Sequence, residues 1–178
     1  MCGRAKTSKK LPKRELRSAH HDLSVADMPG LAFDAVDRHV VLGHGDAVCA
    51  ESPTESLTFV DLLERSASLA GGLNQLGALA GGGIDLRLEP NLERLTFLLA
   101  LIRLGRVPEE QGSAHCSGAP AALHLGDEVL SLEAITKIGR IDPHPAPAED
   151  DSHLLDLLSP QDRSWLELLM RQDRIILD

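Results

Sequence analysis

The chain has 178 residues, of which 43% are hydrophobic, and its formal net charge at pH 7 is −9. This length suffices for one domain with its own core, at about 100–200 residues per domain. The three cysteines are odd in number, which argues against a disulfide scaffold, and no apolar run approaches the roughly 18 residues of a transmembrane helix. We therefore expect a soluble protein of the reducing cytoplasm.

The N-terminal segment is strongly basic. Residues 1–17 carry seven basic side chains and one acidic one, which leaves residues 18–178 with 11 basic and 26 acidic side chains and a formal charge of −15. Such an arm can bind a phosphate backbone or an anionic membrane surface, but repulsion from the acidic remainder opposes both. We expect residues 1–23 to form a disordered, solvated arm that is free to fold back on the acidic body, and we expect no nucleic-acid partner.

The first predicted helix lies in the phrase LAFDAVDRHVVLG, residues 31–43, whose apolar side chains share one face: Phe33, Val36, Val40 and Val41. Asp37, Arg38 and His39 form a polar triplet within it. Adjacent residues of a helix point in different directions, so these three cannot converge on one substrate. We expect a structural or solvent-facing role for them, followed by a strand at residues 46–50.

A longer helix is predicted from Thr58 to Gly77. Thr58 and Asp61 form a capping-box-like pair at its start. The apolar positions then recur at spacings of three, four and seven, which indicates one buried face: Leu62, Leu63, Leu69, Ala70, Leu73 and Leu76.

The next stretch predicts strand, helix and strand. Residues 84–89 alternate apolar and charged side chains, which indicates a strand with one solvent-facing side. Such a strand either lies at a sheet edge or lacks a covering layer. A helix ending at Gly105 leads directly into residues 106–108, which we predict to be a second strand. The two strands should pair in parallel, with the helix as their crossover.

The remaining elements are shorter. Residues 113–120 are small and polar, which predicts a loop, and residues 122–130 should form a hairpin around Gly126 and Asp127. Ser131 can cap a short helix that runs to Ile138.

A proline-rich linker at residues 140–151 precedes a helical tail at residues 152–178. Its longer helix should begin at Ser159-Pro160, with Asp162 closing the cap. We expect this leucine-rich tail to dock over the open sheet; the alternative is that it offers a hydrophobic face to a partner or a second copy.

Several of these phrases resemble a known family. LTFVDLLERSASLAGGLNQLGALAGG followed by IDLRLEPNLERLTFLLALIRLGRVP resembles the N-terminal part of the AMP-forming acyl-CoA synthetases, and LAFDAVDRHVVLGHGDAVCAE resembles their acetyl- and propionyl-CoA branch. The resemblance covers residues 31–108 and is weaker over residues 123–151. It implies an α/β fold: part of a three-layer-like domain at residues 24–139, with a small, mostly parallel sheet and βαβ crossover helices.

The functional motifs of that family do not occur in the 178 residues. Its members bind ATP through a Ser/Thr/Gly-rich loop ending in Pro-Lys-Gly, carry a Tyr-Gly-x-Thr-Glu motif, and use a lysine of a small C-terminal domain; this chain has no tyrosine at all. We therefore predict no catalytic residue, no cofactor-binding residue and no cofactor, and we expect a chain truncated before the ATP-binding motif.

Two other candidate sites are weak. Gly81, Gly82 and Gly83 follow a helix and precede a strand, the reverse of the order in phosphate-binding loops. Six histidines and cysteines lack the spacing of metal ligands, so we predict no metal site: His20, His21, His44, Cys49, His115 and Cys116.

Two functional hypotheses remain open. The first is a fragment related to acid–thiol ligases that cannot adenylate an acyl substrate alone. The second is a stand-alone interaction or regulatory module that pairs with a full-length synthetase or with itself. An enzyme with its own hidden site is a weaker third, because no nucleophile–base or carboxylate pair has a spacing that would place it on one face.

Overall fold

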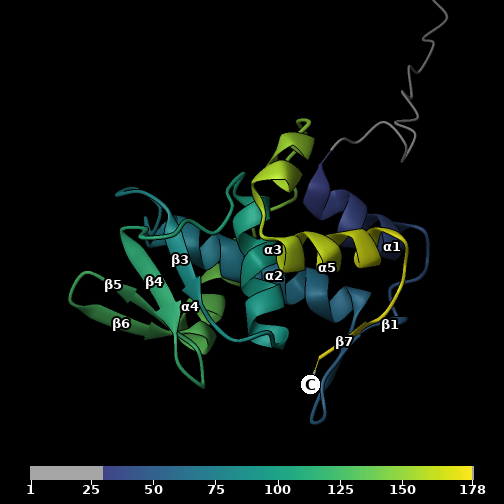
Figure 1. Ribbon diagram of the computed structural model, residues 1–178, viewed down its shortest axis with the longest axis horizontal. Helices are drawn as coiled ribbons and strands as arrows, with labels where there is room; N and C mark the ends of the chain where they lie inside the picture. The colour runs from purple at the N-terminus through teal and green to yellow at the C-terminus, as the bar shows by residue number, and fades with distance from the viewer. Residues whose placement is uncertain (1–29, 178) are drawn as a thin grey trace, which may run out of the picture.

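A computed structural model describes residues 30–177, so the predicted basic arm at residues 1–23 lies outside the described residues. Helical structure begins at Leu31 and continues through η2 and α1. The elements in chain order are η2 (Phe33–Asp37), α1 (Arg38–Val41), β1 (Val48–Glu51), β2 (Ser56–Thr58), α2 (Phe59–Gln75), β3 (Ile84–Arg87), α3 (Leu92–Arg103), β4 (Ala114–Ser117), β5 (Ala122–Leu125), β6 (Glu128–Ser131), α4 (Leu132–Gly139), η3 (Ser152–Leu157), α5 (Pro160–Met170) and β7 (Ile175–Ile176) (Figure 1).

The strands form two small sheets. A four-stranded sheet has the order β3-β4-β5-β6, and a three-stranded sheet has the order β2-β1-β7. Strands β3 and β4 pair in parallel, as do β1 and β7, whereas the pairs β4/β5, β5/β6 and β1/β2 are antiparallel. The α/β class is thus confirmed, but the expected mostly parallel sheet is wrong. Residues 118–121 are too short a connection for a parallel crossover, so β5 must return beside β4 in the antiparallel sense.

The predicted crossover exists, but its second strand lies further along the chain. Residues 106–108 are irregular, and the strand that pairs with β3 is β4, in the segment predicted to be a loop. Ala114 and Cys116 are buried and alternate with the half-buried His115 and Ser117. The small side chains of Ala114 and Cys116 pack in a hydrophobic core with residues of α2, α3 and α4, but they give little hydrophobic signal in the sequence. The charged face of β3 is explained by its position at the sheet edge.

Helix α3 lies between two hydrophobic cores. One core joins η2, β1, the first half of α2 and α5, and the other joins the second half of α2, β3, β4, β5 and α4. Helix α3 contributes Leu95, Leu98, Leu99 and Ile102 to the first core and Phe97, Ala100 and Leu101 to the second. A helix that is apolar on both sides is buried on both sides. Figure 1 accordingly shows α2 and α3 in the middle of the molecule, with the four-stranded sheet and α4 to one side.

The C-terminal tail is packed, although not where the sequence suggested. Trp165, Leu166 and Leu169 of α5 are buried in the first core, against η2 and α3, rather than on the four-stranded sheet. Strand β7 extends the other sheet by pairing with β1. The tail therefore completes the core around η2. The domain boundaries predicted at residues 139 and 151 stay predictions.

The predicted helix caps are present. Thr58 Oγ1 accepts a hydrogen bond from the Asp61 N–H at 3.2 Å, and the Asp61 carboxylate accepts one from the Thr58 N–H at 3.0 Å. Ser131 Oγ and Ser159 Oγ cap α4 and α5 by accepting hydrogen bonds from the Ala134 and Asp162 N–H groups. No helix within residues 30–177 combines the length and the apolar character that crossing a membrane requires.

Replacing Thr58 by alanine tests the cap of α2, in which Thr58 and Asp61 bond each other reciprocally. The substitution removes the acceptor for the Asp61 N–H and the hydroxyl that donates to Asp61 Oδ2 at 2.6 Å. We expect the free energy of unfolding to fall by about 1 kcal/mol. Urea denaturation followed by fluorescence of the sole tryptophan, Trp165, measures it. A serine at position 58 keeps the acceptor and should restore most of the loss; equal losses for both variants would contradict the capping role.

Candidate functional site

Helices α2 and α4 contact each other through glycines that bring their backbones close together. A Cβ atom added to Gly72 would lie 2.1 Å from the carbonyl oxygen of Ile135, and one added to Gly71 would lie 2.3 Å from that of Asp142. On the other side, a Cβ atom at Gly139 would lie 1.8 Å from the carbonyl oxygen of Ser68. Glycine within a helix is unfavourable by about 1 kcal/mol, and here it permits backbone contact between the two helices.

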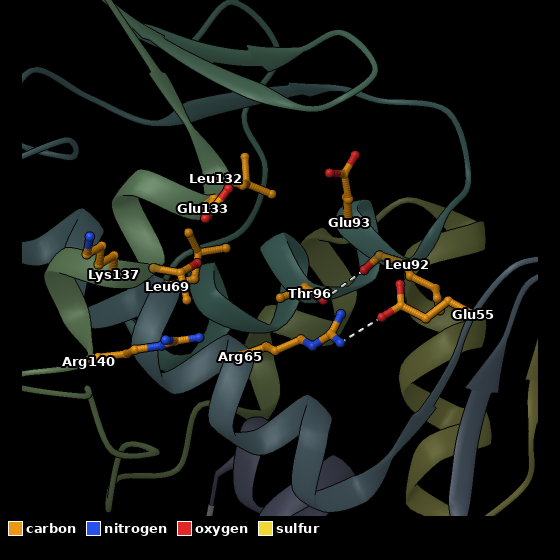
Figure 2. Close-up of a pocket in the computed structure, with 11 residues that line it drawn as sticks. Glu55, Arg65, Leu69, Leu92, Glu93, Thr96, Leu132, Glu133, Lys137 and Arg140 are labelled. Atoms are coloured by element: carbon orange, nitrogen blue, oxygen red, sulfur yellow. Dashed lines mark hydrogen bonds and ion pairs between the residues drawn. The ribbon is translucent and has the colours of Figure 1, made fainter.

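A cavity of about 350 Å³ lies beside this contact. Leu69, Leu92 and Leu132 give it apolar lining, and its other lining residues are polar or charged: Glu55, Arg65, Glu93, Thr96, Glu133, Thr136, Lys137 and Arg140. Figure 2 shows these side chains arriving from α2, α3, α4 and the β1–β2 hairpin. A second cavity of about 510 Å³ shares Arg65, Thr136 and Arg140 with the first, so one groove follows the α2–α4 contact. A pocket with apolar lining and a few converging polar groups is the default candidate for a binding site.

Several charged and polar side chains of this groove already have partners within the protein. Arg65 Nη2 lies 2.7 Å from Glu55 Oε1, Thr96 Oγ1 donates to the Leu92 carbonyl at 2.8 Å, and Glu93 Oε2 accepts from the Ala121 N–H at 3.1 Å. Lys137 and Arg140 are exposed and form no ion pair with other described residues. The groove therefore carries both charge signs and favours no single class of ligand.

The structure does not bring Asp37, Arg38 and His39 together. Asp37 forms a two-contact ion pair with the buried guanidinium of Arg103, whose Nη1 lies 3.1 Å from Asp37 Oδ2. Arg38 donates to Asp34 at 3.2 Å and to the Met170 carbonyl at 3.0 Å. His39 lies 2.8 Å through Nε2 from the Leu169 carbonyl oxygen, to which it donates. All three side chains hold η2 and α1 against neighbouring elements.

Burial lowers the pKa of His39 below its ordinary value of 6.5, against the opposing effect of its hydrogen bond to Leu169. Partial burial, followed by the neighbouring charge of His124, likewise lowers the pKa of His115. The two rings of His115 and His124 stack at 4.3 Å between centroids on the outer face of the sheet. Folding therefore favours the neutral form of His39 and of His115.

This gives a prediction for the dependence of stability on pH. As the pH falls, these histidines bind a proton near pH 6.5 in the unfolded chain but only at a lower pH in the folded protein. Their contribution to the free energy of unfolding should therefore be constant above pH 6.5 and should decrease as the pH falls below that value. Urea denaturation between pH 8 and pH 5 measures the trend. A His39→Gln variant keeps a donor but cannot titrate, so its profile should be flatter. An unchanged slope in this variant and in a His115→Gln variant would contradict the prediction.

The remaining candidates fall into structural positions. Cys49 and Cys116 are buried free thiols, and burial raises the pKa of each to about 12, which makes both unreactive. No group of three or more metal-ligating side chains occurs within residues 30–177; His20 and His21 lie outside that range. A Cβ atom at Gly83 would lie 2.2 Å from the carboxyl carbon of Glu109, so an acidic group stands where a phosphate would have to bind.

Two arginines with distant ionic partners were not anticipated from the sequence. Arg94 pairs with Asp162 at 2.8 Å and donates to the carbonyls of Leu86 and Leu88, both at 2.9 Å, which ties β3 to α5. Arg103 joins α3 to η2 through Asp37. The partners are 68 and 66 residues away in the sequence, so no local pattern identifies them.

Comparison with known proteins finds relatives for part of this chain. No protein-family model matches it. Acetyl-coenzyme A synthetases of Mycobacterium bovis and Mycobacterium tuberculosis are 37% identical to it over 81 residues, which is 42% of this chain and 12% of each relative. The acetyl-coenzyme A synthetase of Streptomyces avermitilis is 31% identical over 80 residues, again 42% of this chain and 12% of the relative.

Among solved structures, an anthranilate CoA ligase in complex with anthranoyl-AMP overlaps with a TM-score of 0.41 at 17% identity, over 48% of this chain and 17% of that chain. The matched stretch spans only 12% of the acetyl-coenzyme A synthetases named above. Over that stretch the predicted resemblance to the AMP-forming acyl-CoA synthetases is confirmed.

Proposed function

We propose that this chain is a scaffold segment of an acyl-CoA synthetase-like protein and that it does not adenylate an acyl substrate by itself. One observation carries the proposal: four side chains within residues 31–108 that could take part in chemistry are held in contacts that build the fold. Asp37 and Arg103 neutralise each other, His39 donates to a backbone carbonyl, and Cys49 is a buried thiol. Groups used in this way are not available to a substrate.

The relatives suggest which chemistry to test. They are acetyl-coenzyme A synthetases, so the substrate class to examine is a short carboxylic acid together with ATP and coenzyme A. The free buried thiols Cys49 and Cys116 are in keeping with a reducing compartment such as the cytoplasm.

ATP–pyrophosphate exchange with acetate or propionate tests the proposal. We expect the purified chain to show only the background rate, while an active acetyl-CoA synthetase in the same buffer shows full exchange. Exchange that co-purifies with the chain would overturn the proposal. An Arg94→Met variant serves as the control for contamination, since its disrupted fold should reduce any exchange that belongs to this chain and leave a contaminant's rate unchanged.

A second function is favoured by the four-stranded sheet. Its outer face is polar and carries the row Asp85, His115 and His124, and its edge strand β6 exposes Val129 by 61%. An open edge strand can pair with another chain. In this case the chain would associate with itself or with a full-length synthetase.

Sedimentation equilibrium over a wide range of protein concentration tests this second function. Self-association through β6 should raise the mean mass with concentration, and Val129→Lys should abolish the rise. Val41→Lys, at an equally exposed position of α1, is the matched control. A concentration-independent monomer that also fails to bind a full-length acetyl-CoA synthetase would count against it.

A further inference from the structure

Asp151 is a buried carboxylate with one unused oxygen. The residue is only 6% exposed, and its Oδ1 accepts a hydrogen bond from the Leu31 N–H at 2.6 Å. Its Oδ2 is buried and has no hydrogen-bond partner within residues 30–177. Buried carboxylate oxygens are nearly always hydrogen-bonded, and burial of a charge without a partner is unfavourable. The group therefore calls for a donor from outside the described range.

This carboxylate lies where the undescribed N-terminal segment joins the body. Its bonded partner, Leu31, is the second described residue, and a Cβ atom added to Gly30 would lie 2.7 Å from the carbonyl oxygen of Pro147. The segment leading to Asp151 thus passes directly against the start of the described chain. Gly30 and Leu31, the first two described residues, therefore lie beside the segment that ends in this carboxylate.

Two exposed acids stand next to Asp151. Neither Glu149 nor Asp150 forms an ion pair with another described residue. The Asp150 carboxylate accepts a hydrogen bond from the Ser152 N–H at 3.0 Å, and this bond lowers the pKa of Asp150, so the group is ionised at neutral pH. Residues 149–151 therefore form an acidic site whose negative charge is not neutralised within residues 30–177.

We propose that the basic residues of positions 1–17 bind in cis to the acidic site at residues 149–151. The seven basic side chains of that segment face a remainder with a formal charge of −15, so the two parts are complementary. An arginine or lysine supplies the donor that Asp151 Oδ2 lacks, in a charge-assisted hydrogen bond. The N-terminal segment thereby acts as an intramolecular counterion for the acidic body.

Chain length permits this contact. Arg17 is 13 residues before Gly30, and an extended chain spans at most about 3.6 Å per residue, so the segment can leave the body and return to it. Because ligand and site are covalently linked, their effective concentration is about millimolar for short flexible connections. A weak ionic contact is then well occupied at low salt, and it should be lost as salt screens it.

A spin label on Cys2 locates the segment in the full chain. Cys49 and Cys116 are buried with a pKa of about 12, so Cys2 is the thiol that reacts under native conditions. At low salt we expect the label to cause its largest loss of amide NMR signal at residues 149–152, and about 0.5 M NaCl should restore those signals. Absence of loss there, or an even loss over the whole acidic surface, would overturn the proposal.

Variants separate this site from general attraction between opposite charges. The triple variant Glu149→Gln, Asp150→Asn and Asp151→Asn should abolish the localised loss. The control triple Glu110→Gln, Asp127→Asn and Glu128→Gln removes three acids elsewhere, all of them exposed, and should leave the localised loss intact.

An equal effect of the two triple variants would overturn the assignment of the binding site to residues 149–151. Asp151→Asn alone retains an acceptor for Leu31 and serves if the triple variant does not fold. A mixture of two samples distinguishes binding within one chain from binding between chains. One sample carries the spin label and no isotope label, and the other carries the isotope label and no spin label. Signal loss in that mixture would overturn binding in cis. The outcome does not depend on adenylating activity.

Discussion

Replacement of Asp37 by alanine is expected to lower the free energy of unfolding by about 3–5 kcal/mol, because it leaves the Arg103 guanidinium buried without a counter-charge. The side chain of Arg103 is 1% exposed and that of Asp37 is 17% exposed. Without Asp37, the side-chain partner of Arg103 that remains within residues 30–177 is the Ser66 hydroxyl, which lies 3.0 Å from its Nε. Urea denaturation followed by Trp165 fluorescence measures the change, since that side chain is buried in the same core as η2.

The neighbouring ion pair provides the control. Asp34 pairs with Arg38 at 3.2 Å, but the two side chains are 42% and 33% exposed. Alanine at Asp34 should therefore cost less than about 1 kcal/mol. If Asp37→Ala does not fold, the double variant Asp37→Ala with Arg103→Met still tests the mechanism, because a buried ion pair can often be replaced by apolar groups with little loss. Similar losses for Asp34→Ala and Asp37→Ala would contradict it.

The features that the sequence predicts correctly are those with local signals. The Thr58–Asp61 cap, the hairpin turn at Gly126-Asp127 and the proline-led start of α5 are each specified by residues no more than a few positions apart. Such signals depend on backbone hydrogen bonds and on φ preferences that neighbouring residues decide. The same holds for the alternation in β3, which predicts its exposed face.

The features that the sequence does not predict depend on distant partners. Strand β7 has two residues and exists because Ile175 and Ile176 pair with Ala50 and Glu51. Strand β4 is built from small side chains whose burial is decided by β3 and the helices beneath it. The α2–α4 groove is likewise invisible locally, since its charges come from α2, α3, α4 and the β1–β2 hairpin. Only the glycine pair in the middle of α2 hints at it.

That glycine pair gives the second large effect. Alanine is the better helix former by about 1 kcal/mol, so propensity alone predicts that Gly72→Ala stabilises α2. Packing predicts the opposite, because the new Cβ atom would lie 2.1 Å from the Ile135 carbonyl oxygen and 2.8 Å from the Ile135 Cγ2 atom. Backbone cannot give way as a flexible side chain can, so we expect a net loss of more than about 2 kcal/mol.

The position of the loss distinguishes packing from a general effect of the substitution. Gly45→Ala adds the same atom where the nearest neighbours lie at 3.6 Å and 3.7 Å, both of them side-chain atoms, and should leave stability nearly unchanged. Amide hydrogen exchange should show faster opening of α4 in Gly72→Ala, because α4 is held to the body chiefly through α2. A Gly72→Ala protein as stable as the parent would mean that α4 can move outward at no cost, and the groove beside it would then be adjustable rather than fixed.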